Sequence, residues 1–361
     1  MKRLFAMAAA ALLAAACVLP VKVQAISARR AILLDAATGR VIYEKDADRR
    51  SLIASTTKIM TALIVCEQCN VLDRVCIPKE AVGIEGSSIY LREGEILTIQ
   101  ELLYGMMLHS GNDAATALAI YCGGTVEGFA GLMNDKAREL GLDGTHFVNP
   151  HGLDAPNHYS TAKDLAVLAA YALKNPIFAT TVGAKTVTAG QRMLTNHNKL
   201  LWRVEGANGV KTGYTKAAGR ILVSGAKRQG RQLICVTIDA PTDWQDHANL
   251  LEQGFAQYSV KELISQGEEI AHLEVVAGKE KWVTLISAED FVYPIAIGEK
   301  ITVELPNTGF AYAPVAENAV AGTAHVKLNG KTVGSIELLY KSTVELSEEP
   351  SKSLWQRILR R

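Results

Sequence analysis

The chain has 361 residues, of which 48% are hydrophobic and 21% charged, and its formal net charge is +1. This length predicts two domains, and this composition excludes an intrinsically disordered chain. The near-zero net charge argues against a protein that binds nucleic acid through phosphate contacts. The charge is unevenly spread: residues 26–350 carry 31 basic and 37 acidic side chains, whereas residues 1–25 and 351–361 carry basic residues and no acid.

Residues 1–25 have the pattern of an export signal peptide. Lys2 and Arg3 precede an apolar run at residues 4–19, and small residues suited to cleavage follow, ending at Ala25. The run of 16 residues is shorter than the ~20 that a membrane-spanning helix needs. We therefore predict cleavage after Ala25 rather than a retained anchor. Cys17 only faintly resembles a lipoprotein site, because Ala14 precedes it where a larger aliphatic residue is expected.

The first half of the body alternates short strands with helices. Residues 30–34 and 40–44 are short apolar stretches around a Gly-containing turn, which predicts a β-hairpin. A long helix is expected to begin near Ser55. Thr161 and Asp164 resemble a capping box at the start of a later helix. The other helices are expected at residues 100–108, 113–122, 126–140 and 162–173.

The second half returns to strands. Residues 209–214, 220–227 and 231–239 are expected to be strands, followed by a helix at 244–258. Strands at both ends of this region, with helices between them, predict an α+β domain with helices packed on an antiparallel sheet. Beyond about residue 262 the pattern predicts a small all-β domain. Its strands are expected at 270–276, 282–286, 301–305, 323–328 and 332–339.

The predicted organisation therefore has four parts. These are a signal peptide (1–25), the α+β domain (26–262), the all-β domain (263–345), and a spacer with a basic tail (346–361). Drawn as a helix, the tail gathers Leu354, Trp355, Ile358 and Leu359 on one arc, with basic residues on the rest. Such a segment favours contact with an anionic membrane surface. The alternative is a tail that packs on its own β domain or stays in water.

Five cysteines remain after the predicted cleavage, and an odd number cannot pair completely within one chain. Cys66 and Cys69 have the spacing of a zinc half-site, but no second paired ligand motif accompanies them. They also lie in an apolar helical run, where cysteine packs as a small hydrophobe. We therefore predict buried structural thiols, without a metal, for the set Cys66, Cys69, Cys76, Cys122 and Cys235.

Three short elements carry the chemistry. The chain contains no G-x-S-x-G, no H-E-x-x-H and no phosphate-binding loop. It does contain a Ser-x-x-Lys at the expected helix start, a Ser-x-Asn in an interhelical turn, and a Lys-Thr-Gly on an expected edge strand. Ser-x-x-Lys alone is weak, since it recurs at Ser160 and Ser224, so the ordered set is the signal. Its residues are Ser55, Lys58, Ser110, Asn112, Lys211, Thr212 and Gly213.

Physical chemistry explains how this set could act. Ser55 and Lys58, three residues apart on a helix, project from one face and can meet. A serine hydroxyl becomes a good nucleophile when a neighbour takes its proton. Lysine can do so only when neutral, and both burial and a second cation such as Lys211 lower its pKa. Ser110 could relay a proton, Asn112 could hold Lys58, and Lys211 could attract a substrate carboxylate.

These motifs and their flanks resemble those of penicillin-binding proteins and serine β-lactamases, most closely the low-molecular-mass D-alanyl-D-alanine carboxypeptidases. The resemblance covers about residues 28–260, and more loosely the β domain. It implies a β-lactamase/transpeptidase-like fold, no cofactor, peptidoglycan stem peptides as substrate and β-lactams as covalent inhibitors. The segments that carry it are Leu34-Asp-Ala-Ala-Thr-Gly39, Ala54-Ser-Thr-Thr-Lys-Ile-Met-Thr-Ala62, Ser110-Gly-Asn-Asp-Ala114, Asn149-Pro-His-Gly-Leu-Asp154 and Gly209-Val-Lys-Thr-Gly-Tyr-Thr215.

The resemblance also implies a role for each residue. Ser55 forms the acyl-enzyme, and Lys58 is its general base. Ser110 and Asn112 assist proton transfer and substrate positioning, and Lys211 binds the terminal carboxylate with Thr212 beside it. The oxyanion would lie between the backbone N–H groups of Ser55 and Tyr214. His151 could line the cleft or cap its own loop, whereas His109 is expected to be structural.

Two alternatives remain open at this point. One is a β-lactamase, which needs fast deacylation; the loop at residues 149–159 holds Asp154 but no glutamate to activate water. The other is a non-catalytic wall-binding protein in which the β domain matters most, and the intact Ser55, Lys58 and Lys211 argue against it. The sequence favours an exported, membrane-associated carboxypeptidase.

Overall fold

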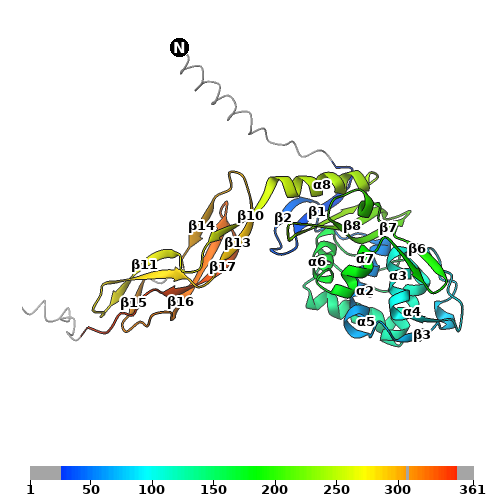
Figure 1. Cartoon of the computed structure of the whole chain (residues 1–361), viewed down its shortest axis with the longest axis horizontal. Helices are drawn as coiled ribbons and strands as arrows, with labels where there is room; N and C mark the ends of the chain where they lie inside the picture. The colour runs from blue at the N-terminus through cyan, green and yellow to red at the C-terminus, as the bar shows by residue number, and fades with distance from the viewer. Residues whose placement is uncertain (1–25, 306–308, 348–361) are drawn as a thin grey trace, which may run out of the picture.

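The computed structural model describes residues 26–305 and 309–347, which form two domains (Figure 1). The first is α+β, as predicted, and is built on a five-stranded antiparallel sheet with the order β2-β1-β9-β8-β7. Segments from both ends of the domain thus pair in one sheet. Its strands are β1 (Arg30–Asp35), β2 (Val41–Lys45), β7 (Ala207–Thr215), β8 (Gly219–Arg228) and β9 (Arg231–Ile238).

The sheet lies between two layers of helices. Helix α8 (Asp243–Gln257) covers one face, and the other helices of the domain cover the opposite face (Figure 1). Side chains of β1 alternate between the two layers: Ile32 and Leu34 join the larger helical cluster, whereas Leu33 packs with residues of α8. The sheet is therefore apolar on both faces and buried between its helices.

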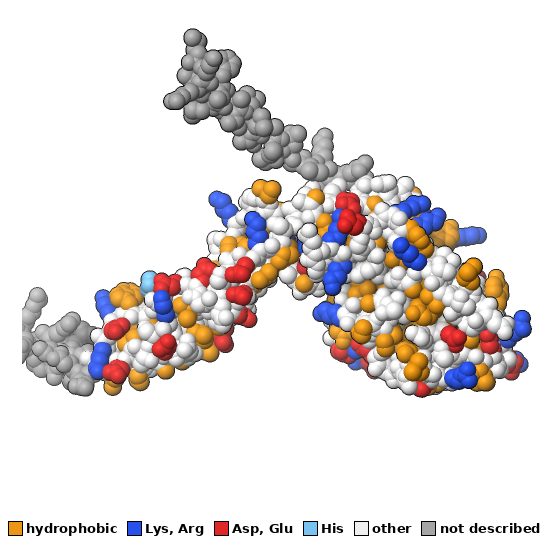
Figure 2. All heavy atoms as spheres, in the orientation of Figure 1, with side chains coloured by type: hydrophobic (Ala, Val, Ile, Leu, Met, Phe, Trp, Pro, Cys, Tyr) orange, Lys and Arg blue, Asp and Glu red, His pale blue; other side chains and the backbone are white. Residues whose placement is uncertain are grey.

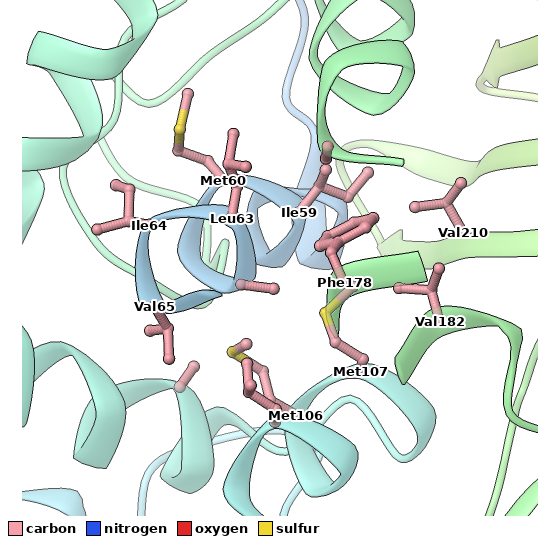
Figure 3. Packing of buried hydrophobic residues seen from close by; sticks show 14 of the residues in the cluster. Ile59, Met60, Leu63, Ile64, Val65, Met106, Met107, Phe178, Val182 and Val210 are labelled. Carbon is pink, nitrogen blue, oxygen red and sulfur yellow. The ribbon is translucent and has the colours of Figure 1, made fainter. Parts of the chain in front are cut away.

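Helix α2 (Lys58–Gln68) lies at the centre of the larger helical layer. Every residue from Lys58 to Cys66 is buried, and Figure 3 shows its apolar side chains among those of neighbouring helices, such as Met106 and Phe178. A helix that is apolar all round must be buried in this way. The helix follows a 3₁₀ turn, η1 (Ala54–Thr57), so helical structure begins at Ala54, close to the predicted start at Ser55.

The other predicted helices are present with bounds shifted by a few residues, and one helix was missed. Asn175 caps the missed helix with two hydrogen bonds, and Pro176 occupies its first turn. Asn followed by Pro is a typical helix start, so this helix could have been predicted from the sequence. The helices are α3 (Ile99–Leu108), α4 (Asn112–Gly123), α5 (Val126–Glu139), α6 (Ala162–Ala172) and the missed α7 (Pro176–Gly183).

The predicted capping box at α6 is only half present. The Thr161 hydroxyl accepts from the Asp164 backbone N–H at 3.0 Å, as predicted. The Asp164 carboxylate instead accepts from the Gly144 N–H and the Thr145 hydroxyl. A complete capping box does occur at α3, between Thr98 and Glu101, where no prediction was made.

Several short elements of the first domain were also absent from the sequence prediction. Their brief length and weak periodicity hide them from a pattern search. They are the hairpins β3 (Arg74–Cys76) with β4 (Ile96–Thr98) and β5 (Thr186–Ala189) with β6 (Arg192–Thr195), and the 3₁₀ turns η2 (Lys79–Ala81) and η3 (Lys199–Trp202).

The second domain is all-β, as predicted. A six-stranded sheet has the order β14-β16-β17-β12-β11-β15, and a separate pair joins β10 to β13. Three of these strands, β10, β13 and β15, were not predicted. The bounds are β10 (Tyr258–Ile264), β11 (Glu269–Val276), β12 (Trp282–Ser287), β13 (Phe291–Ala296), β14 (Ile301–Glu304), β15 (Phe310–Tyr312), β16 (Val320–Leu328) and β17 (Lys331–Tyr340).

Two arginines of the first domain make contacts with the second domain. The Arg40 guanidinium binds Glu299 at 2.5 Å, contacts the Pro294 carbonyl, and lies over the Tyr258 ring at 4.8 Å. Arg231 donates to the Tyr258 carbonyl at 2.6 Å. The junction between the domains is therefore fixed by charged and aromatic contacts as well as by the chain.

The cysteines differ partly from the prediction. Cys66 and Cys235 are buried, as expected, but Cys69 and Cys122 are half-buried and Cys76 is exposed. Cys69 directly follows α2, and Cys76 is the last residue of β3. Both therefore lie at the end of an element rather than inside the core. Across residues 26–305 and 309–347, no group of three or more His, Cys, Asp or Glu side chains is arranged to hold a metal ion.

Acidic and basic side chains are interspersed on the face of the molecule that Figure 2 shows. In the described part of the chain, no single helix has the length and apolar character to cross a membrane; α6 and α7, bent by 110°, meet that test only as a pair. The predicted signal peptide, Cys17 and residues 348–361 of the predicted tail lie outside the described residues.

Candidate active site

Ser55 and Lys58 meet at the junction of η1 and α2. The Lys58 amine is 3.0 Å from Ser55 Oγ, although the two residues lie in successive turns of different helix type. Lys58 is completely buried, whereas Ser55 is half-buried and lines a cleft of about 400 Å³. The hydroxyl is thus open to a substrate, and the amine beside it is shielded from bulk water.

Two further acceptors fix the orientation of the Lys58 amine. Its Nζ lies 2.6 Å from Asn112 Oδ1 and 2.7 Å from the His151 carbonyl oxygen. A neutral amine has two N–H donors and one lone pair. If both donors bind these oxygens, the lone pair is left for the Ser55 hydroxyl. The arrangement is that of a general base beside a nucleophile.

Ser110 lies in the turn between α3 and α4, and Asn112 is the first residue of α4. Ser110 has a φ of +65°, which is uncommon for a residue other than glycine and directs the chain sharply into α4. The Asn112 amide donates to the Glu85 carbonyl at 2.6 Å. The neighbouring Asp113 carboxylate accepts from the backbone N–H groups of Ile89 and Leu91. This network holds the loop around residues 85–91 against the site.

Strand β7 supplies Lys211, Thr212, Gly213 and Tyr214 along the edge of the sheet. Lys211 is 2% exposed, and its Nζ donates to Ser110 Oγ at 3.1 Å. A Cβ at Gly213 would lie 3.3 Å from the Ser55 backbone nitrogen, so β7 passes very close to η1. Three segments far apart in the sequence are thereby joined around one cleft.

Burial lowers the pKa of both lysines, and repulsion from a neighbouring charge adds to the effect at Lys58. Burial lowers the pKa of Lys58 well below its ordinary value, and the positive charge of Lys211 lowers it further, while Asp113 acts in the opposite direction. Burial lowers the pKa of Lys211 to about 7. The lowered pKa favours the neutral form of Lys58, and a pKa of about 7 leaves Lys211 partly charged at neutral pH.

His151 reaches the site through its backbone carbonyl, and its ring lies close enough to be affected: burial, and then the charges of Lys58 and His158, lower its pKa to about 3. Its carbonyl binds Lys58, whereas the ring Nδ1 accepts from the Leu153 N–H at 3.2 Å. This bond is consistent with a loop-capping role for the ring, one of the two expected roles. Gly152, next in the chain, has a φ of +89°, and a Cβ there would lie 1.8 Å from the Ala54 carbonyl oxygen. Only glycine allows this loop to pack against η1.

The cleft also contains residues that the sequence analysis did not select. His197 lines it beside Lys211, and its ring packs against that of His109 with centroids 4.9 Å apart. Burial, Lys211 and His109 lower the pKa of His197 to about 4. No sequence motif marks His197, because only the fold brings it to this cleft. The remaining lining residues are Ser87, Lys199, Arg220, Ile221, Asp243 and Trp244.

Solved structures define the class of protein first. The chain resembles penicillin-binding protein 5 of Haemophilus influenzae with a TM-score of 0.76 and 30% identity, over 91% of this chain and 99% of that one. A Streptomyces K15 DD-transpeptidase structure matches with a TM-score of 0.62 and 36% identity, over 64% and 99%. The fold is therefore the transpeptidase-like fold of penicillin-binding proteins, followed by an all-β domain.

Sequence comparisons define the family. Residues 18–242 match the model of the D-alanyl-D-alanine carboxypeptidase family, and residues 258–346 match that of the penicillin-binding protein 5 C-terminal domain. The chain is 33% identical to the carboxypeptidase DacF of Bacillus subtilis, covering 92% of this chain and 88% of that protein. It is also 33% identical to DacC of Escherichia coli, covering 90% and 86%. The protein belongs to the D-alanyl-D-alanine carboxypeptidases, a family of serine-type peptidases that bind penicillin.

Proposed function

We propose that the protein removes the terminal D-alanine from peptidoglycan stem pentapeptides through an acyl-enzyme on Ser55. One observation carries this proposal: the Lys58 amine contacts Ser55 Oγ, Asn112 Oδ1 and the His151 carbonyl at 3.0, 2.6 and 2.7 Å. In its neutral form, Lys58 can donate to the last two and accept the proton of Ser55. The lowered pKa of Lys58 favours this neutral form.

The reaction would proceed in two halves. Ser55 Oγ attacks the carbonyl carbon of the D-Ala-D-Ala amide, its proton passes to Lys58, and the oxyanion binds the backbone N–H groups of Ser55 and Tyr214. The C–N bond then breaks, and the leaving nitrogen receives a proton through Ser110. Water hydrolyses the resulting ester, Lys58 again takes a proton, and Ser55 regains its hydroxyl.

Lys211 and Thr212 would hold the free carboxylate of the terminal D-alanine. The short distance from Lys211 Nζ to Ser110 Oγ, 3.1 Å, supports this role, because Ser110 and Thr212 line the cleft and Lys211 therefore places positive charge next to it. Asn112 and Gly213 would position the substrate backbone along the β7 edge. A bound carboxylate would also favour the charged form of Lys211, whose pKa burial lowers to about 7.

β-Lactams would acylate the same serine. Their strained amide presents a carbonyl to Ser55 and a carboxylate to Lys211, as the peptide terminus does. Once the ring opens, the leaving nitrogen remains attached to the acyl group, so it cannot diffuse away as D-alanine does. We therefore expect covalent, long-lived penicillin adducts on Ser55 rather than rapid turnover, which separates this function from that of a β-lactamase.

The protein would act outside the cytoplasm. Residues 1–25 have the composition of a cleavable signal peptide, and residues 351–361 that of a basic amphipathic helix that binds an anionic membrane surface reversibly. A protein that ends at Pro350 should move from the membrane to the soluble fraction and keep its activity on a free pentapeptide. Retention on membranes after a high-salt wash would contradict the role of the tail.

The decisive experiment uses a synthetic pentapeptide that ends in D-Ala-D-Ala. Mass spectrometry should detect a tetrapeptide and free D-alanine, and penicillin added first should abolish both products. A cross-linked product, in which the tetrapeptidyl group is joined to an amine of a second pentapeptide, would point to transpeptidation instead of hydrolysis. Release of no product, with an unmodified Ser55 after incubation with penicillin, would contradict the proposal.

A further inference from the structure

A pair of cysteines lies at the ends of α2 and α4, away from the catalytic cleft. Cys69 directly follows α2, and Cys122 is in the last turn of α4. Both side chains are half-buried, and the Cys122 thiol donates a hydrogen bond to the sulfur of Cys69. The two side chains are therefore neighbours in the fold, although they are 53 positions apart in the chain numbering.

A second contact holds the same two helix ends together. The hydroxyl of Tyr121, the neighbour of Cys122, donates to the Asp73 carboxylate at 3.1 Å. Asp73 lies in the turn that follows Cys69, and its backbone N–H binds the Asn70 carbonyl at 3.0 Å. The C-terminal ends of α2 and α4 therefore lie near each other, which supports the proximity of the two thiols independently of the sulfur contact.

The opposite ends of these helices carry active-site residues. Lys58 begins α2 and Asn112 begins α4, and these side chains contact each other at 2.6 Å. The two helices therefore lie side by side in the same direction, joined by Lys58–Asn112 at one end and by the thiols at the other. Eleven residues of α2 separate the two joints by roughly 16 Å.

We propose that Cys69 and Cys122 form a disulfide bond that joins the C-terminal ends of α2 and α4. The oxidant is a disulfide donor, either the disulfide of a thiol oxidoreductase or oxidised glutathione. One S–S bond forms between Cys69 and Cys122, and the donor's S–S bond breaks. The two cysteines lose two electrons and two protons, which convert the donor to two thiols. In the cell, the bond depends on the export proposed above, because a reducing cytosol would keep the pair as thiols.

The surroundings favour Cys69 as the attacking sulfur. The hydrogen bond from Cys122 lowers the pKa of Cys69, so Cys69 more readily forms the thiolate that attacks a disulfide. Cys122 would then resolve the mixed disulfide from its neighbouring position. Cys66, three residues before Cys69, is an unsuitable competitor, because burial raises the pKa of its thiol to about 12.

The bond should stabilise the first domain without altering the chemistry of the cleft. It closes a loop of roughly 50 residues in the unfolded chain, and we expect the melting temperature to rise by roughly 5–10 °C. The sulfurs lie a full helix length from Lys58 and Asn112. The rate of penicillin acylation below the melting transition should therefore change by less than about twofold on oxidation.

The test compares the full-length protein before and after treatment with oxidised glutathione. We expect the mass of the protein to fall by two hydrogens, a digest to contain one peptide pair linked through Cys69 and Cys122, and the melting temperature to rise. Cys69→Ser and Cys122→Ser should each lose the linked peptide and the rise. Cys76→Ser, at the exposed cysteine, should keep both and is the matched control.

A linked peptide that joins Cys66 to Cys69, or glutathione adducts alone, would overturn the proposal. A Cys69–Cys122 bond with no rise in melting temperature would overturn its stabilising role. The same measurements on Ser55→Ala should give the same linked peptide. A failure of the proposed enzyme function is thereby distinguishable from a failure of the disulfide proposal.

Discussion

The two domains differ most in the polar groups that they bury. The first domain buries Lys58, Lys211, Asp113 and His247, each within a network of hydrogen bonds, whereas among the described residues from Tyr258 onward only Ser287 is a buried polar side chain. Two ion pairs of the second domain, Lys279 with Glu345 and Lys341 with Glu269, keep more than half of each side chain in solvent. A third pair, Lys327 with Glu304, is partly covered at Lys327.

This difference in buried polar groups distinguishes the domain that contains the candidate site from the domain that does not. Burying a charged group costs free energy unless it is paired or changes its protonation state. The first domain bears this cost at Lys58 and Lys211, whose pKa values burial lowers. The shift at Lys58 suits the proposed base, whereas a bound carboxylate would favour the charged form of Lys211. The second domain buries apolar clusters, as in the set Ile264, Leu285, Ala324, Val326, Ile336 and Leu338, and among its described residues it buries no charged side chain.

The largest effect is expected at the nucleophile. Ser55→Ala should abolish covalent labelling by fluorescent penicillin, because it removes the hydroxyl that lies 3.0 Å from the buried Lys58 amine in this cleft. Ser160→Ala and Ser224→Ala remove the serine of the two other Ser-x-x-Lys motifs and should still be labelled. If Ser55→Ala is still labelled, penicillin acylates a residue other than Ser55.

A glycine pair tests the packing behind the nucleophile. Gly152→Ala would push a methyl group into the Ala54 carbonyl, displace η1, and should reduce the rate of acylation at least ~100-fold. Gly39 has a similar φ of +70°, but nothing lies within 4 Å of the position that a methyl group would take there, so Gly39→Ala should cost only about 1 kcal/mol of stability. Acylation rates and melting temperatures of both variants distinguish the effect of the clash with the Ala54 carbonyl from the effect of a positive φ alone. Equal losses of activity in the two variants would contradict the role given to Gly152.

The pH dependence of kcat/KM should report the two buried lysines. Activity on the pentapeptide should increase as the pH rises through the lowered pKa of Lys58, since only the neutral amine is a base. It should decrease above about 7, up to about tenfold per pH unit, as free Lys211 loses its charge. Lys211→Arg should remove the decrease, and so should a C-terminally amidated substrate. If the decrease in kcat/KM persists in both cases, a group other than Lys211 causes it.

The first domain should also lose stability in acid. His247 is neutral between Ser224 and Thr237, and burial lowers its pKa to about 3. In the unfolded chain it takes up a proton below about pH 6.5, so its contribution to stability is complete above that pH and declines toward about 3. Between pH 6.5 and 5 the loss is about 2 kcal/mol. Calorimetry should detect it, and His247→Gln should reduce it.

The smallest effect is expected from removing the second domain. A chain ending at Gln257, the last residue of α8, keeps the whole cleft and loses the Glu299 and Tyr258 contacts of Arg40. Its kcat/KM on a soluble pentapeptide should remain within about twofold of that of the intact protein, because no described residue of the cleft lies beyond Trp244. A large loss of kcat/KM, with the melting temperature unchanged, would give the β domain a direct role in substrate binding.

The sequence predicted long elements well and short ones poorly. Helices α3, α4 and α5 have apolar periodicity or clear stops, and the strands of the sheet are apolar runs between turns. The hairpin of β5 and β6 has only four residues in each strand, and its register depends on packing against α3. Cys76 was expected in the core because cysteine usually packs as a hydrophobe, but its place at the end of a short hairpin strand exposes it.

The sequence by itself determined the residue types and spacings of the candidate site. Ser55 and Lys58 are three residues apart, so any helical conformation brings them together. The tertiary structure alone decided what surrounds them. The His151 carbonyl, the position of Gly152 behind η1 and the ring of His197 reach the cleft only because distant loops pack there. Contacts between residues far apart in the chain, and the desolvation that lowers a lysine pKa, arise only when the whole core has assembled.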